Sequence, residues 1–264
     1  MLSMVEAMAI ASALSIGEAL ASHRSDGSIA DVPLHLISSE ARAQEVQDAA
    51  VMAFDESIVG YFATATTAVT QRVLQCDKPI FGPLVASAIL PDRTGFRLPW
   101  GVLGAEWSIG FIIGASYPQL HQPIVFSSFE EAVIGCIPMI TILGRRVTSS
   151  IPLNPWTATA DFGLHVSSSK GEPVFDMHPS DLAGIDVVVS MNDAIVGQSS
   201  GRNIIGDLKG AIMMLAEVLT TQGRRLSPGN IIAVGGGPLI MQAVVGQTFR
   251  ADFGRLGAVQ VEFD

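Results

Sequence analysis

Apolar residues recur at helical spacing near the start of the chain and again near its end. The pattern predicts a helix over residues 1–20 and a second one that Ser38 or Ser39 caps and that runs to about residue 54. A Ser-x-x-Glu capping box at Ser127 predicts a short third helix. A late helix over residues 207–221 places one apolar face toward the core, formed by Ile212, Leu215, Ala216 and Leu219.

Runs of β-branched residues dominate the chain between and after these helices. They predict strands at residues 134–143, 162–167, 186–191, 231–234, 248–253 and 258–263. Asn192 and Asp193 form the expected hairpin turn into a further strand at 194–197. Helices that precede and flank such strands indicate an α+β fold with a mixed sheet system.

Two uncharged runs, residues 107–129 and 226–249, are long enough to cross a membrane. Prolines and a Gly-Gly-Gly-Pro sequence break both runs into strands and turns. The Ala-rich N-terminal stretch contains Glu6 and Glu18 but no Lys or Arg before Arg24, so it is not typical of a signal peptide. We therefore expect no membrane partner.

The overall composition favours a soluble protein with a single core. Of its 264 residues, 48% are hydrophobic and 15% charged, which supplies a core and leaves apolar surface for a homo-oligomer. A net charge of −10 without a basic run argues against nucleic acid as a partner. Cys76 and Cys136 form no disulfide framework, which indicates a reduced, cytoplasmic location.

Several motifs occur in the order that one enzyme family shows. The first is the run at residues 60–66, and Asp77, Pro79, Phe81, Gly82 and Leu84 follow it. The stretch at 104–111 comes next, and then the apolar run at 138–144 that ends in Arg145 and Arg146. The C-terminal matches are Gly201, Gly206, the late helix and residues 226–232 and 251–257.

Together these motifs resemble the 2-keto-4-pentenoate hydratase / 4-oxalocrotonate decarboxylase group of the fumarylacetoacetate hydrolase superfamily. The resemblance implies a mixed β-roll over residues 76–264 behind an N-terminal helical region at 1–75, folded as one unit. It also implies an enzyme of the lyase or isomerase type.

The family binds Mg2+ or Mn2+ through three Glu, two of them one residue apart on a strand. At these positions the chain has Glu106, Ser108 and Thr141, and Phe62 replaces a family Lys. One carboxylate and two hydroxyls would hold a hard cation poorly. We expect no cofactor and disfavour Mg2+ or Mn2+.

The altered positions predict a more apolar pocket around Glu106 and a changed pKa of its carboxylate. Desolvation is expected to raise the pKa of Glu106 and make it a general acid/base. Asp161 is the second catalytic candidate, because it lies where the family closes its pocket. The substrate-binding candidates are Tyr61, Phe62, Ser108, Thr141, Arg146 and His165. For Arg146 an internal ion pair and for His165 a structural hydrogen bond are the favoured alternatives.

Three hypotheses follow for the function. The leading one is a metal-independent enzyme that moves a proton on an enolisable, relatively apolar carbonyl compound in a lyase, dehydration, isomerisation or cyclisation reaction. The second is a non-catalytic subunit that binds a ligand or supports an active partner. The third is a metal-dependent 2-oxo acid hydratase or decarboxylase with rearranged ligands such as Glu106, Asp161 and His165.

Overall fold

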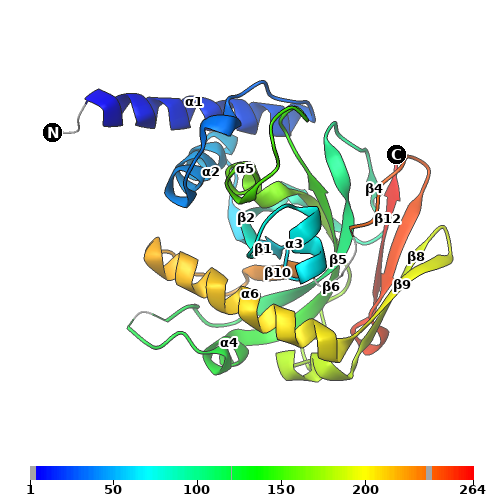
Figure 1. Ribbon diagram of the computed structural model, residues 1–264. Helices are drawn as coiled ribbons and strands as arrows, with labels where there is room; N and C mark the ends of the chain where they lie inside the picture. Colours follow the sequence, from blue (N-terminus) through cyan, green and yellow to red (C-terminus); the bar gives the residue numbers. More distant parts are fainter. Residues whose placement is uncertain (1–3, 120, 236–239) are drawn as a thin grey trace.

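Helices form one side of the molecule and two curled sheets form the other (Figure 1). The computed structural model describes residues 4–119, 121–235 and 240–264, and it describes side chains from residue 12 onward except those of residues 201–207. The α-helices are α1 (Met4–Asp26), α2 (Glu40–Phe54), α3 (Ala68–Val73), α4 (Phe126–Ala132), α5 (Pro155–Ala160) and α6 (Gly201–Thr221). Helices α1 and α2 pack against each other, and α5 packs against α2. None of the described helices is both long and apolar enough to cross a membrane.

The larger sheet has the order β2-β1-β10-β5-β6-β7-β3. Its strands are β1 (Ile58–Thr64), β2 (Ile80–Val85), β3 (Ile89–Pro91), β5 (Val102–Ile113), β6 (Val133–Gly144), β7 (His165–Lys170) and β10 (Ile231–Gly235). The long strands β5 and β6 form its centre and pair antiparallel, with Glu106 opposite Thr141. Strand β1 pairs parallel with β10, so segments far apart in the sequence meet beside β5.

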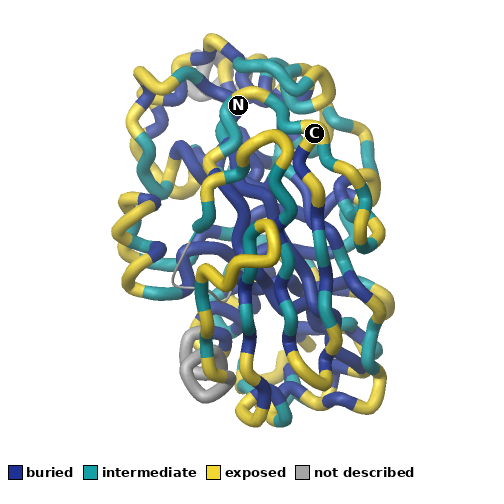
Figure 2. The backbone as a smooth tube through the Cα atoms, turned by 90° about the vertical axis from the view of Figure 1, so that its right-hand side faces the viewer, coloured by how far each residue is buried: buried dark blue, intermediate teal, exposed yellow. Residues whose placement is uncertain are grey.

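The smaller sheet has the order β4-β12-β11-β8-β9. Its strands are β4 (Gly95–Phe96), β8 (Asp186–Met191), β9 (Ala194–Ser200), β11 (Thr248–Asp252) and β12 (Ala258–Phe263). The main core lies between this sheet, helix α6 and the face of β5 that carries Trp107 and Phe111. Figure 2 shows buried positions along the strands in the middle of the molecule and exposed positions at the turns.

The expected α+β class is confirmed, and most expected elements are present. The strands expected at 186–191 and 258–263 have those limits, and Asn192 and Asp193 form the turn at positive φ. Ser39 caps α2 by accepting the backbone N–H of Arg42. Helix α1 extends six residues past the expected end, and its expected first three residues lie outside the described part of the chain.

Two expectations about local structure are wrong. The capping box at Ser127 does not form, because α4 begins at Phe126 and Val125 is its N-cap. The strand expected at 162–167 begins only at His165, since a 3-10 turn with Gly163 at φ 63 precedes it. The motif run at 60–66 lies mostly in strand β1, where its side chains alternate between two buried faces of the sheet.

The position of β1 also bears on the domain division. Residues 58–64 belong to the larger sheet, so the expected helical region at 1–75 contributes a strand to the β-roll. The last helix before the first strand of the sheet is α2, which ends at Phe54. The division into 1–75 and 76–264 remains a proposal, and the shared sheet supports the view that both parts fold as one unit.

Candidate functional site

Strand β5 presents two chemically different faces. Trp107, Ile109 and Phe111 point into the main core, whereas Glu106 and Ser108 point to the opposite face. On that face Thr141 of β6 lies beside them, and the side chains of β1 and β10 complete the surroundings. Glu106, Ser108 and Thr141 are all buried, with at most 1% of their surface exposed. The structure therefore brings together the three family metal positions.

Glu106 is an isolated buried carboxyl group. The Thr64 hydroxyl donates to Glu106 Oε1 at 2.7 Å. Gly235 leaves the carboxyl its space, because a Cβ at that position would collide with the carboxylate oxygens. No ion pair to Glu106 is found within the described part of the chain. Burial raises the pKa of Glu106 to about 8, and the Thr64 hydrogen bond opposes part of that rise, so the predicted direction is confirmed.

A row of hydroxyl groups runs across the sheet beside Glu106. Ser108 Oγ lies 2.9 Å from Thr141 Oγ1, which lies 3.0 Å from Ser168 Oγ. Ser168 Oγ is in turn 3.0 Å from His165 Nε2. The row thus crosses strands β5, β6 and β7 and ends on a buried histidine.

Arg24 sets the direction of these hydrogen bonds. One of its guanidinium nitrogens lies 3.4 Å from His165 Nδ1. A guanidinium can only donate, so Nδ1 accepts. Burial and the nearby arginines lower the pKa of His165 well below its usual value, and the neutral ring then carries its proton on Nε2 and donates to Ser168. If each hydroxyl passes the direction on, Ser108 is left with its own O–H free to donate to a ligand oxygen.

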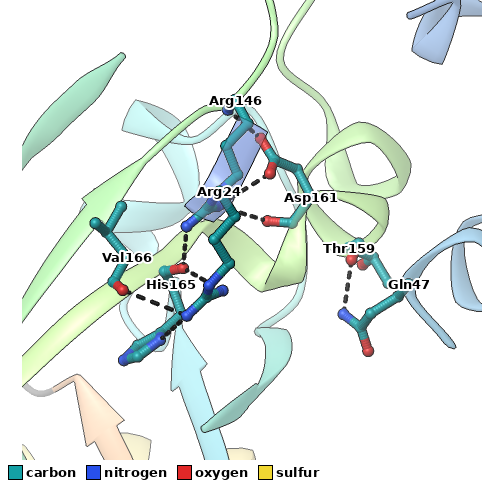
Figure 3. A network of polar contacts seen from close by, with 7 residues as sticks. All are labelled: Arg24, Gln47, Arg146, Thr159, Asp161, His165 and Val166. Atoms are coloured by element: carbon teal, nitrogen blue, oxygen red, sulfur yellow. Dashed lines mark hydrogen bonds and ion pairs between the residues drawn. The ribbon is translucent and has the colours of Figure 1, made fainter. Parts of the chain in front are cut away.

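Asp161 and Arg146 form a buried ion pair. The Asp161 carboxylate accepts the backbone N–H of Arg146 at 2.6 Å and its guanidinium at 2.9 Å. The guanidinium also donates to the carbonyl of His165, beside the Arg24 contacts in Figure 3. The catalytic expectation for Asp161 and the substrate-binding expectation for Arg146 find no support in this geometry, whereas the alternative of an internal ion pair is what the structure contains.

The aromatic candidates fall on opposite faces of β1. The Phe62 ring is buried on the Glu106 face, with its centroid 5.6 Å from that of His165. Tyr61 points to the other face, where its hydroxyl lies near Arg224. The expected role of Tyr61 in substrate binding therefore does not fit, since adjacent strand residues point in opposite directions.

Sequence reasoning missed four residues of this site: Thr64, Gly235, Ser168 and Arg24. Thr64 follows Phe62 by two positions, so strand alternation would have placed it beside Glu106. Gly235 was expected in a turn, yet it ends strand β10 opposite Ser108. Ser168 lies among three serines in a strand. Arg24 joins the site from 141 residues away and gives no local signal.

The residues present do not fit a hard divalent cation. Among the residues whose side chains are described, only one carboxylate lies at the site, and the neighbouring hydroxyls already bond one another. The alternative ligand set is not brought together, because Asp161 binds Arg146 and both nitrogens of His165 have partners. Across residues 4–119, 121–235 and 240–264, no group of three or more His, Cys, Asp or Glu could hold a metal ion.

The raised pKa of Glu106 predicts a pH dependence of stability. Its ordinary pKa is 4.5 and its pKa in the fold is about 8, so the folded state retains a proton that the unfolded state loses in this interval. The stabilisation is complete below pH 4.5 and is lost as the pH rises to about 8. Urea unfolding at pH values between these limits should show that the unfolding free energy falls by a few kcal/mol at most as the pH rises. This is the order of magnitude that proton linkage to Glu106 gives. The same measurements on Glu106→Gln should lack this loss. If the unfolding free energy changes with pH equally in both proteins, the assignment to Glu106 is contradicted.

Proteins named as hydratases align with most of this chain. A 2-keto-4-pentenoate hydratase 2 from Dechloromonas aromatica is 26% identical over 226 residues, which cover 83% of both chains. The TodF product hydratase of Pseudomonas putida is 27% identical over 227 residues, 83% of this chain and 81% of that one. No protein-family model matches the chain.

Solved structures extend the likeness to the whole fold. The 4-oxalocrotonate decarboxylase from Pseudomonas putida G7, complexed with magnesium and adipate, superposes with a TM-score of 0.80 at 19% identity, over 100% of this chain and 99% of that one. A protein assigned to the fumarylacetoacetate hydrolase family from Yersinia pestis CO92 gives a TM-score of 0.60 at 14% identity, over 80% and 95%. The chain is thus a divergent relative of the 2-keto-4-pentenoate hydratase and 4-oxalocrotonate decarboxylase group, a homologue of lyase-type enzymes with the fumarylacetoacetate hydrolase fold.

Proposed function

We propose that the protein is a lyase-type or isomerase-type enzyme in which Glu106 transfers a proton on an enolisable, relatively apolar carbonyl compound. The observation that carries the proposal is the isolated Glu106 carboxyl with a pKa near 8. Such a group is present in both protonation states near neutrality, which suits a general acid/base. The hydratase relatives support the reaction class, since their names describe small-molecule lyase chemistry.

Each neighbouring side chain has a role in this proposal. The Glu106 carboxylate takes a proton from the carbon next to the substrate carbonyl, and the electron pair of that C–H bond moves into an enolate. The Ser108 hydroxyl, the last donor of the hydroxyl row, stabilises the enolate oxygen. Glu106 then returns the proton to another carbon of the same molecule. Phe62 supplies an apolar wall, which favours a less charged substrate.

We further propose that this chemistry requires no tightly bound metal. The structural relative from Pseudomonas putida G7 was solved with magnesium, so metal content is the first discriminating measurement. The purified protein should contain well under one equivalent of Mg2+ or Mn2+, and EDTA should leave its activity unchanged, because the described side chains place only one carboxylate at the site. Elemental analysis that finds a stoichiometric ion, lost together with activity on Glu106→Gln substitution, would favour the metal-dependent alternative.

A non-catalytic ligand-binding or partner subunit is the second candidate. The complete burial of Glu106, Phe62, Ser108 and Thr141 favours it, because a working site must admit substrate. Proton exchange decides between the two candidates. An enzyme exchanges the α-hydrogens of a suitable ketone with D2O, whereas a binding subunit does not. A homo-oligomer and a cytoplasmic location also remain proposals.

A further inference from the structure

A large cavity lies away from Glu106, between the end of helix α1, the segment before β5 and the start of β7. Its volume is about 710 Å³, and it is open to solvent on one side. Among the residues that line it, Ser28, Trp100 and Ser167 mark three of its walls. Glu106, Ser108 and Thr141 do not line it. The cavity is therefore a separate space.

Four arginines line this cavity: Arg24, Arg97, Arg145 and Arg146. This concentration of positive charge occurs in a chain whose net charge is −10. Only two carboxylates, Asp26 and Glu56, share the lining, and Glu56 already accepts the backbone N–H of Ser87. The cavity thus contains an excess of cationic groups.

Among the described residues only Arg146 of these four has an ion-pair partner, Asp161. Arg24 is held instead by backbone carbonyls, at 3.0 Å to His165 and 3.3 Å to Val166. Its guanidinium also stacks on the Phe162 ring, 4.4 Å from the centroid. Arg145 donates to the carbonyl of Ile151 at 2.5 Å. These contacts fix the two guanidinium groups in place without neutralising them.

The positive charge in this region is only partly compensated, since Asp161 and Glu56 act on Arg24 without forming an ion pair with it. Burial, and then the neighbouring Arg146, lower the pKa of Arg24 well below its usual value. Burial likewise lowers the pKa of Arg145. A lowered arginine pKa means that the surroundings disfavour the cation, so a bound anion would relieve this cost.

Part of the lining is apolar. Trp100 is 78% exposed and is accompanied by Phe96, Leu90, Leu98 and Pro99. A tryptophan ring can pack on the ring of a ligand while a nearby guanidinium binds its acid group, so this lining suits a ring-bearing anion.

We propose that this cavity binds a small organic anion, a carboxylate or a phosphate ester on a flat apolar body, at a site distinct from Glu106. Arg97 and Arg145 bind the acid group, because both lack an ion-pair partner among the described residues and guanidinium matches carboxylate and phosphate oxygens in a bidentate manner. Arg24 stabilises the bound charge from the inner wall. The proposal is independent of any reaction at Glu106, and its test is a binding measurement.

Calorimetric titration of the full chain with benzoate, phenyl phosphate and neutral benzamide tests it. At least one of the two anions should bind saturably, and benzamide should bind about tenfold more weakly or not at all. Added NaCl should lower the affinity for the anion, because salt screens the charges. The anion that binds with the higher affinity shows whether the site prefers a carboxylate or a phosphate group. Arg97 is exposed, so Arg97→Gln should keep the fold. It should lower the affinity for the anion about tenfold or more.

Arg93 provides the matched control in the same segment. Its side chain is 66% exposed, pairs with Asp92 and does not line the cavity, so Arg93→Gln should change the affinity less than about twofold. Equal binding of benzamide, no saturable binding of either anion, or an Arg97→Gln affinity equal to that of the unmodified chain would each overturn the proposal. Glu106→Gln should leave the affinity unchanged, and a loss there would place the ligand at the other site.

Discussion

Replacing Glu106 by Gln is expected to lower turnover by about a hundredfold or more, the usual scale for losing a general acid/base. The amide keeps the size of the buried carboxyl and can still accept the Thr64 hydrogen bond, so the fold should persist. It cannot accept a proton from carbon. The measurement is NMR of α-hydrogen exchange in D2O, first on a panel of enolisable 2-oxo compounds with the unmodified protein and then on the best substrate with the variant.

The matched control for this substitution is Glu131→Gln, on the exposed side of helix α4. It removes one carboxylate of the same type without touching the Glu106 face, so exchange should proceed at the unmodified rate. If Glu106→Gln exchanges as fast as this control, the carboxyl is not the proton-transfer group. If no compound of the panel exchanges with the unmodified protein, the non-catalytic alternative gains.

Removing the Asp161 carboxylate is expected to cost about 3–5 kcal/mol of unfolding free energy, the usual penalty for leaving one partner of a buried ion pair alone. Asp161 is fully buried, and it holds both the backbone and the guanidinium of Arg146. Urea unfolding of Asp161→Ala measures the loss. If the variant does not fold, Asp161→Asn retains an acceptor for the backbone N–H and should lose less.

An exposed ion pair serves as the comparison. Asp252 pairs with Arg250 at 2.9 Å while 47% of its side chain is exposed. Solvent screening limits the contribution of such a pair, so Asp252→Ala should cost less than about 1 kcal/mol. Equal costs for the Asp161 and Asp252 variants would show that the Asp161 pair has no structural importance, and the catalytic interpretation of Asp161 would then need a new test.

The sequence by itself determined much of the fold and one central residue of the site. Runs of β-branched residues marked the strands at 186–191 and 258–263, because such side chains pack well on the half-buried face of a sheet. Ordered motifs indicated the superfamily fold that the structural relatives share. They also marked Glu106, Ser108 and Thr141 as neighbours, since strand alternation and the family pattern both place them on one face.

Only the tertiary structure decided what surrounds these residues. The approach of β1 and β10 to β5 brought Thr64 and Gly235 to Glu106, and this pairing joins segments about 170 positions apart. Asp161 became an ion-pair partner because the end of β6 lies beside it, which no local pattern encodes. Arg24 reached His165 only through the packing of the end of α1 against Phe54 and Phe162. Local periodicity fixes which face a side chain takes, but long-range packing fixes which side chains share it.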